Sequence, residues 1–181
     1  MTKALRERLE LVAGVGKVFV GPLDDPDAAG ASLILFLYRI MPNPSLRNRE
    51  HRVPSDAPPP VVVFGNSLPL DLCYLVTVGT TPGGDEEALL ETLGGAMQAL
   101  QLEPELTGAG VGHETVHVSL DPLTTEEMSR IWALFPTANY RTSISYLASP
   151  VWIDPKIPAA VGAPVVKDSL DVGARATFDS V

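Results

Sequence analysis

Two apolar runs of strand length stand out along the chain, at residues 33–40 and 70–78. In the first run, LILFLYRI, apolar side chains fall on both alternating faces, which is typical of a strand in the middle of a sheet that is covered on both sides. Pro42 and Pro44 then remove two ladder donors and end the strand. In the second run, LDLCYLVTV, an apolar face alternates with a mixed face. We therefore predict two main strands, at residues 32–41 and 70–78.

Shorter apolar patterns predict three further strands, at residues 17–21, 115–120 and 140–153. Pro150 lies late in the last of them and implies a bulge or an edge position, because proline cannot donate to a ladder. Residues 61–64, VVVF, are either a short strand or an apolar patch that docks elsewhere. They lie in the connection 42–67, whose length is unusual inside a compact domain and is typical of a functional or mobile segment.

Apolar side chains at helical spacing predict helices at residues 3–13 and 85–103. Acidic residues in the first turn of the second helix complement its dipole. The pattern Thr124-x-x-Glu127 is a capping box that begins a third helix, and Pro136 ends it.

Two glycine-rich stretches need separate explanations. Gly94-Gly95, inside the second helix, costs about 1 kcal/mol per glycine relative to alanine. Close approach of the backbone to the sheet explains the pair better than a hinge does. Residues 108–112, GAGVG, follow a helix and lack the Lys-Ser/Thr ending of a phosphate-binding loop, so a flexible turn is the better interpretation.

The order of these elements, roughly α-β-β-β-α-β-α-β, predicts an α+β fold with a mostly antiparallel mixed sheet and helices packed on its faces. Residues 1–154 form one domain in this interpretation. Residues 155–181 contain several prolines and few apolar residues, and we expect an extended C-terminal tail. Its short apolar pieces could add to a sheet edge as an interaction arm: they contain Val165, Val166 and Phe178.

Composition narrows the class of protein. The chain has 181 residues, of which 45% are hydrophobic and 19% charged, as in a globular domain. No apolar run approaches the ~20 residues of a membrane span, and the N-terminus lacks the apolar core of a secretory signal. The net charge of −9 argues against nucleic-acid binding, which needs clustered basic residues. The single cysteine, Cys73, excludes an internal disulfide and is best interpreted as buried packing.

The residues that could carry chemistry do not form a recognisable active site. His113 and His117 lie in a loop that enters a strand, about 13 Å apart, without the helical geometry of a zinc pair. We interpret these two histidines and His51 as surface residues. Asp71 more often pairs with arginine or caps a backbone amide than acts as a catalyst. We therefore predict no catalytic, cofactor-binding or metal-binding residues. The alternative is a small-molecule-binding domain or an enzyme that uses His113 and Glu114.

The stretch after the first main strand offers an interaction surface. Asn43, Arg47, Asn48 and Arg49 are hydrogen-bonding residues on a loop that prolines stiffen. Arginine suits bidentate pairing with carboxylates of a partner. On these residues alone, a protein interface and an ordinary solvated loop are equally compatible with the sequence.

Segments between residues 37 and 154 together resemble the N-terminal domain family of the tail-terminator, or cap, proteins of extracellular contractile injection systems. These systems are phage-tail-like particles with an inner tube inside a contractile sheath. The segments are LYRIMPNPSLRNR, LPLDLCYLVTV, MQALQLEPEL, EEMSRIWALF and YRTSISYLASPVWID. The chain departs from the family in a shorter helical lead-in, a proline-rich connection at residues 50–67, and Cys73 where the family often has a polar residue.

The resemblance implies a structural protein with a phage tail-terminator-like fold. It implies a homo-oligomer, a hexameric ring, that ends tube and sheath polymerisation and attaches the last sheath layer to the tube. The partners would be the inner tube protein and the sheath protein. Assembly would take place in the cytoplasm of the producing bacterium, as part of a particle that can be released. The resemblance also favours a contact role for the loop at residues 43–49.

Overall fold

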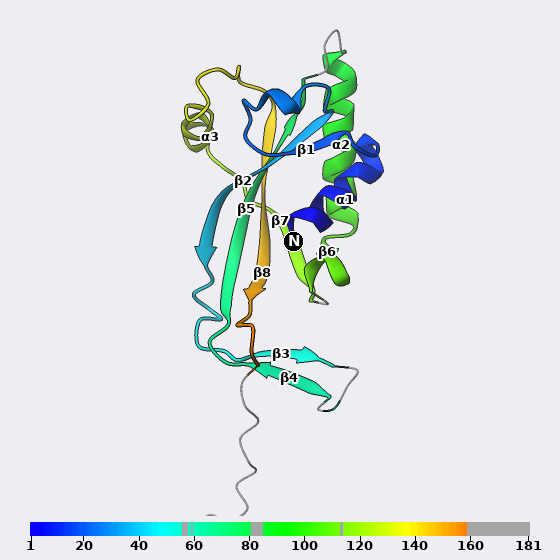
Figure 1. Ribbon diagram of the computed structural model, residues 1–181. Coiled ribbons are helices and arrows are strands. Elements are labelled where there is room, and N and C mark those ends of the chain that lie inside the picture. Colours follow the sequence, from blue (N-terminus) through cyan, green and yellow to red (C-terminus); the bar gives the residue numbers. More distant parts are fainter. Residues whose placement is uncertain (56–57, 59, 81–84, 113, 159–181) are drawn as a thin grey trace, which may run out of the picture.

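The computed structural model describes residues 1–55, 58, 60–80, 85–112 and 114–158, and its centre is a six-stranded sheet (Figure 1). The strand order is β1-β2-β5-β8-β7-β6. β1 runs parallel to β2, and every other neighbouring pair is antiparallel. The strands are β1 (Val18–Val20), β2 (Leu33–Pro42), β5 (Leu68–Val78), β6 (Glu105–Leu106), β7 (Val116–Leu120) and β8 (Ser143–Ile153).

Helices cover both faces of one half of this sheet. α1 (Thr2–Ala13) and α2 (Glu86–Leu102) pack on one face, and α3 (Thr125–Trp132) packs on the other. None of the helices in the described ranges is long and apolar enough to cross a membrane. Two short 3-10 helices, η1 (Pro26–Ala28) and η2 (Ala109–Val111), lie in connections. The α+β fold with a mostly antiparallel sheet is therefore confirmed.

Two apolar clusters form the core. The larger lies between the sheet and α1 and α2 and includes Leu5, Leu9, Leu93, Leu100 and Tyr74. The smaller lies between the sheet and α3 and includes Ile34, Leu75, Trp132 and Phe135. Because both clusters lie in the helix-covered half, the other half of the sheet extends beyond the core (Figure 1).

The strand predicted for the middle of the sheet lies one position further out. β2 is the second strand, and β5 and β8 occupy the centre. Leu33, Ile34 and Leu35 are buried, but Arg39 and Ile40 are exposed. The reason is that β1 and the helices cover only the first half of β2. β5, by contrast, is buried from Leu72 through Val78.

The long connection between β2 and β5 contains a second, two-stranded sheet. β3 (His51–Pro54) pairs antiparallel with β4 (Val61–Phe64), so VVVF is a strand. This hairpin, residues 51–64, is called the arm below. It extends from the end of the main sheet that the helices leave uncovered (Figure 1). No described residue of the arm belongs to either core cluster.

Two local predictions are refined. Pro150 lies in a bulge: Leu70 and Leu72 of β5 pair with Val151 and Ala148 of β8, which is an interior strand. The prediction that the glycine pair in α2 approaches the sheet is wrong, because only Gly95 makes a close approach, and it approaches α1. A Cβ on Gly95 would lie 2.8 Å from Val12 Cγ1, whereas one on Gly94 would meet nothing within 4 Å.

Candidate functional site: the loop and arm at one end of the sheet

The loop after β2 is held in place by Asn43. Its side-chain amide donates to Asp71 Oδ1 at 2.9 Å and to Ser149 Oγ at 3.3 Å. Its side-chain oxygen accepts from the backbone N–H groups of Ser45 and Leu46, at 3.0 and 3.1 Å. The Asn43 side chain therefore anchors the loop to β5 and β8, and its hydrogen-bonding groups face inward.

The other predicted interface residues of the loop point away from the protein. Arg47, Asn48 and Arg49 are all exposed. Among the described residues, neither arginine has an ion-pair partner. The loop that Asn43 anchors thus exposes two guanidinium groups with no ion-pair partner in the described part of the chain, a geometry suited to carboxylates of a partner.

The base of the arm is fastened to the main sheet by His51. The side chain of His51 is only 5% exposed. Its Nδ1 lies 2.7 Å from Asp154 Oδ1, and its Nε2 lies 2.7 Å from Glu114 Oε1. The imidazole also stacks on Trp152, with ring centroids 4.5 Å apart and an interplanar angle of 7°. Ser67, which follows β4, donates to the same Asp154 oxygen at 2.6 Å.

This cluster corrects the interpretation of His51 as a surface residue. Sequence reasoning missed it because Asp154 lies 103 residues away and Glu114 lies 63 residues away. The one available signal was the pattern HRVP, which resembles a short strand that precedes VVVF across a proline-rich turn. His117 is exposed, as predicted, and His113 lies outside the described residues.

The two β5 residues that were considered for chemistry, Asp71 and Cys73, have structural roles. Asp71 accepts from Asn43 and from Ser149 Oγ at 2.6 Å, so it holds the loop in place. Cys73 is buried, as expected, and this burial raises the pKa of its thiol. A thiol with a raised pKa is a poor nucleophile at neutral pH.

The alternative site around Glu114 has little room for a ligand. The Glu114 carboxylate is engaged by His51, and the neighbouring cavity of about 190 Å³ is lined by Val111, Val116 and Trp152 among others. Ligand pockets usually have volumes of about 300–1,000 Å³. In the glycine-rich stretch beside it, η2 packs on α1: the N-terminal amino group donates to Gly110 O at 3.0 Å. Among the described residues, no His, Cys, Asp and Glu side chains form a group that could hold a metal ion.

An apolar surface lies beside the loop, where the sheet extends beyond α1 and α2. It consists of Ile40, Leu68 and Ile153, which are 56%, 47% and 55% exposed, and is called the sheet-end patch below. These residues come from β2, β5 and β8, which are adjacent strands. A cavity of about 490 Å³ adjoins Leu68 and is lined by Pro42, Pro44 and Arg47 among others. Leu68 of the patch and Arg47 of the basic loop therefore line the same cavity.

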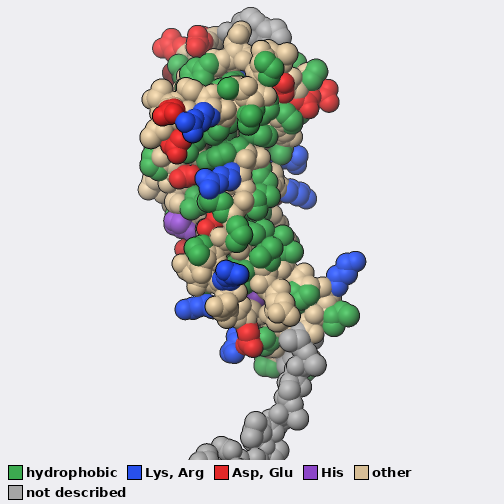
Figure 2. Space-filling view, turned by 90° about the vertical axis from the view of Figure 1, so that its left-hand side faces the viewer, with side chains coloured by type: hydrophobic (Ala, Val, Ile, Leu, Met, Phe, Trp, Pro, Cys, Tyr) green, Lys and Arg blue, Asp and Glu red, His purple; other side chains and the backbone are tan. Residues whose placement is uncertain are grey.

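Charge is distributed unevenly along the molecule. Figure 2 shows Lys and Arg side chains around the end that carries the arm, whereas acidic side chains gather toward the opposite end. Five acidic residues, in the first turn of α2 and near η1, have no ion-pair partner among the described residues. They are Glu86, Glu87, Asp24, Asp25 and Asp27.

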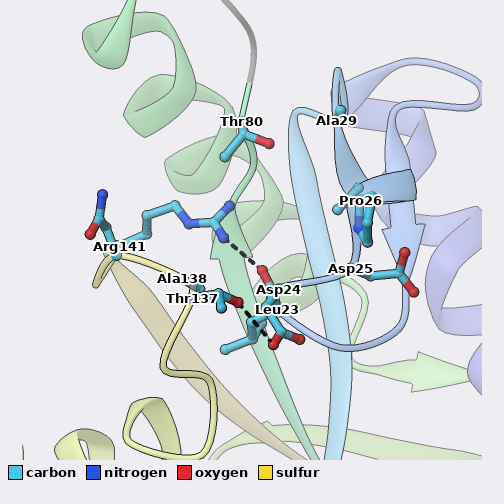
Figure 3. Close-up of a pocket in the computed structure, with 11 residues that line it drawn as sticks. Leu23, Asp24, Asp25, Pro26, Ala29, Thr80, Thr137, Ala138 and Arg141 are labelled. Atoms are coloured by element: carbon cyan, nitrogen blue, oxygen red, sulfur yellow. Dashed lines mark hydrogen bonds between the residues drawn. The ribbon is translucent and has the colours of Figure 1, made fainter.

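A further cavity of about 490 Å³ lies at the acidic end (Figure 3). Thr137 donates to Asp24 Oδ2 at 3.2 Å, and Arg141 donates to Leu23 O at 2.8 Å. Burial lowers the pKa of the Arg141 guanidinium, which also lies 5.6 Å from the centre of the Trp132 ring. These contacts join the β8 side of the sheet to the loop around η1, which is a structural role.

The remaining predicted interface residues, Val165, Val166 and Phe178, lie outside the described residues. The described chain ends at Pro158, shortly after β8. The described chain therefore stops at the same end of the molecule as the loop, the arm and the sheet-end patch.

Comparison with known proteins gives matches over most of the chain. The family model for the Pvc16 N-terminal domain matches residues 1–167. Among solved structures, one similar chain is the sheath/tube terminator, in its extended state, of an extracellular contractile injection system, PVC. Its TM-score is 0.62 at 18% sequence identity, and the match covers 98% of this chain and 64% of that one.

The cap of the anti-feeding prophage, a tube-terminating cap, is also similar. Its TM-score is 0.62 at 17% identity, with 93% of this chain and 60% of that chain covered. No curated protein matches this chain in sequence. At these identities the structural matches establish a common fold, and this chain spans less than two thirds of the length of either structure.

Proposed function

This chain belongs to the Pvc16 N-terminal domain family, and we propose that it is a structural cap that terminates the tube of a contractile injection system. The family match over residues 1–167 carries the proposal. It agrees with the family predicted from the sequence. The two solved structures support it further, since one is a sheath/tube terminator and the other a tube-terminating cap. The role is that of a structural protein, without catalysis.

The finer form of the proposal has three parts. The cap is a hexameric ring that assembles in the cytoplasm of the producing bacterium. It contacts the last layer of the inner tube and holds the last layer of the sheath to it. An elongated molecule with one basic and one acidic end suits a ring, because a head-to-tail contact between unlike surfaces closes into a ring when the rotation allows it.

Removal of the chain from a producing strain tests the proposed function. Without a cap, tubes should exceed their normal length or lose their sheath, and expression of the intact chain in trans should restore both. Electron microscopy of negatively stained particles gives the length distribution and the sheathed fraction. Particles of normal length with an attached sheath would contradict the proposal.

The loop at residues 43–49 is proposed as a contact, either between neighbouring subunits of the ring or with the last tube layer. Its support is a pair of exposed arginines, without ion-pair partners among the residues that the structure describes, on a loop that Asn43 anchors. The double variant Arg47→Glu/Arg49→Glu should therefore lower the fraction of capped particles without unfolding the protein.

A matched control reverses two charges elsewhere. Lys3 and Arg130 are exposed and take part only in ion pairs within their own helices, and such pairs contribute little to stability. The Lys3→Glu/Arg130→Glu variant should cap normally. Equal capping by the two double variants would show that the loop makes no essential contact.

The C-terminal tail, residues 155–181, is proposed as an interaction arm that reaches the sheath or a neighbouring subunit. Its apolar pieces and its exit beside the sheet-end patch support this role. Deletion of residues 156–181 should leave the domain folded, because no described residue beyond Val151 contributes to a core cluster. Capped, contraction-competent particles made by the truncated chain would contradict the proposal.

A further inference from the structure

β2 has an open edge at the end of the molecule that carries the sheet-end patch. On its outer side β2 pairs with β1 only over Leu33, Ile34 and Leu35. Beyond residue 36, no described strand pairs with that side of β2. An uncovered edge presents a row of backbone donors and acceptors that can pair with another strand.

The sheet-end patch lies on the face of the sheet that carries α1 and α2. Ile40 pairs with Leu72, and Leu68 pairs with Ile153. Residues directly opposite each other project to the same face, as do residues an even number of positions apart along a strand. Leu72 is buried in the larger core cluster. The patch is therefore a continuation of the core surface past the ends of the helices, next to the open edge of β2.

The chain leaves the described structure beside this patch. Ile153 belongs to the patch and is the last residue of β8. The next residue, Asp154, is held by His51 and Ser67, so the exit point is fixed. Pro155 follows, and the chain bends at Lys156 and Ile157 before Pro158.

We propose that the C-terminal segment of a neighbouring copy, residues 159–181, adds as a strand to the open edge of β2 and covers the sheet-end patch. This inference rests on the proposed ring. The segment contains the β-branched pair Val165-Val166 and the apolar Phe178, which suit an edge strand and an apolar surface. Its 23 residues span at most about 80 Å when extended, enough to reach an adjacent subunit.

We take a neighbouring copy as the donor because a strand of one subunit that pairs with β2 of the next would link each subunit of the proposed ring to its neighbour. Return of the segment to β2 of its own chain is the competing arrangement, and disulfide trapping distinguishes the two.

Disulfide trapping between two differently tagged chains tests the inference. One chain carries Ile40→Cys, and the other carries Val166→Cys or Phe178→Cys. Both are produced together in a strain that lacks the native chain. After mild oxidation of purified particles, a disulfide-linked pair that contains both tags is expected for at least one of the two combinations. The native Cys73 is buried and stays in place.

Leu11 provides the matched control. It is 80% exposed on α1, away from the patch. A chain with Leu11→Cys should give far less mixed product than one with Ile40→Cys, because its thiol is exposed on α1 and not on β2. A single chain that carries Ile40→Cys together with Val166→Cys tests whether the segment pairs with β2 of its own chain. Linkage within that chain, without any mixed product, would overturn exchange between copies.

The length of the particles separates this inference from the proposed function. Normal capping without a linkage at either position would overturn the strand addition and leave the cap role intact. If particles made with the native chain showed no capping by this protein, the proposed function itself would fail. A mixed product at Ile40 together with normal capping supports both.

Discussion

At the residue scale, His51 is the side chain that joins the arm to the sheet. A neutral imidazole has one donor and one acceptor, whereas ionised carboxylates only accept. Both contacts of His51 can therefore be hydrogen bonds in two ways. Either both ring nitrogens carry a proton and donate, or one carboxyl group carries a proton and donates to the ring nitrogen that has none. The stacked Trp152 fixes the plane of the ring. A single buried residue thus sets where the arm begins.

Replacement of His51 should loosen the arm. His51→Ala leaves Asp154 and Glu114 without their shared partner, and the loss of hydrogen bonds to charged groups should lower the free energy of unfolding by about 1.5–3 kcal/mol. Urea denaturation measures the loss, and hydrogen exchange should rise in β3 and β4. His117→Ala, at an exposed position, is the control and should change neither quantity.

Tyr38 is expected to titrate late. Burial raises its pKa to about 12, and the nearby Asp121 carboxylate adds to the effect. Its hydroxyl lies 2.9 Å from Ser145 Oγ and donates to Asp121 Oδ2 at 3.3 Å. An unfolded tyrosine titrates near pH 10, so the folded-state pKa is the higher one. The stabilising contribution is complete below about pH 10 and is lost as the pH rises toward 12.

The measurement is an ultraviolet titration of the tyrosine ionisation. The Tyr38→Phe variant should lack a phenol that titrates near pH 12 and should lose less stability than the native chain as the pH rises from about 10 toward that value. If both proteins titrate identically in that range, the environment assigned to Tyr38 is wrong.

At the element scale, neighbouring glycines in α2 should respond in opposite ways to alanine. A Cβ at Gly94 meets open space, so Gly94→Ala should stabilise the helix by up to about 1 kcal/mol. A Cβ at Gly95 meets the stiff, β-branched Val12 at 2.8 Å, so Gly95→Ala should gain less or destabilise. Thermal unfolding of the two variants compares them directly, and equal stabilisation would contradict the close approach of α1 and α2.

The capping box of α3 offers a second prediction at this scale. Thr124 N–H donates to Glu127 Oε2 at 2.9 Å, and Glu127 N–H donates to Thr124 Oγ1 at 3.2 Å. Thr124→Ala should lower the free energy of unfolding by about 0.5–2 kcal/mol. Thr125→Ala, one position into the helix, is the control and should have a smaller effect. Chemical denaturation measures both.

At the scale of the whole molecule, the arm and the core are separate. Because the described residues of the arm contribute to neither core cluster, its outer part can be removed without loss of the core. Replacement of residues 53–62 by a two-residue turn keeps the pairing of His51 with Phe64. We expect a melting temperature within a few degrees of the native value and a loss of capped particles. A large fall in the melting temperature would show that the arm stabilises the fold.

Local patterns predicted most of the elements and part of the site. The strand β5, the helices α1 and α2 and the capping box of α3 were predicted from residues close in sequence, and each was confirmed, although both faces of β5 are buried from Leu72 on. The loop at residues 43–49 was likewise located, because Pro42 and Pro44 mark the end of the strand. The inward role of Asn43 was missed, since its partners Asp71 and Ser149 are distant in sequence.

The sequence by itself determined the α+β class, the two main strands, the approximate helix boundaries and the absence of a recognisable catalytic motif. Only the tertiary structure decided that β5 and β8 are central, that His51 is buried between two carboxylates, and that no described strand covers the outer edge of β2 at the end of the sheet. The physical reason is how far apart the interacting residues lie along the sequence. Periodicity and capping are local, whereas strand order, burial and hydrogen bonds across 63 or 103 residues exist only once the chain has folded.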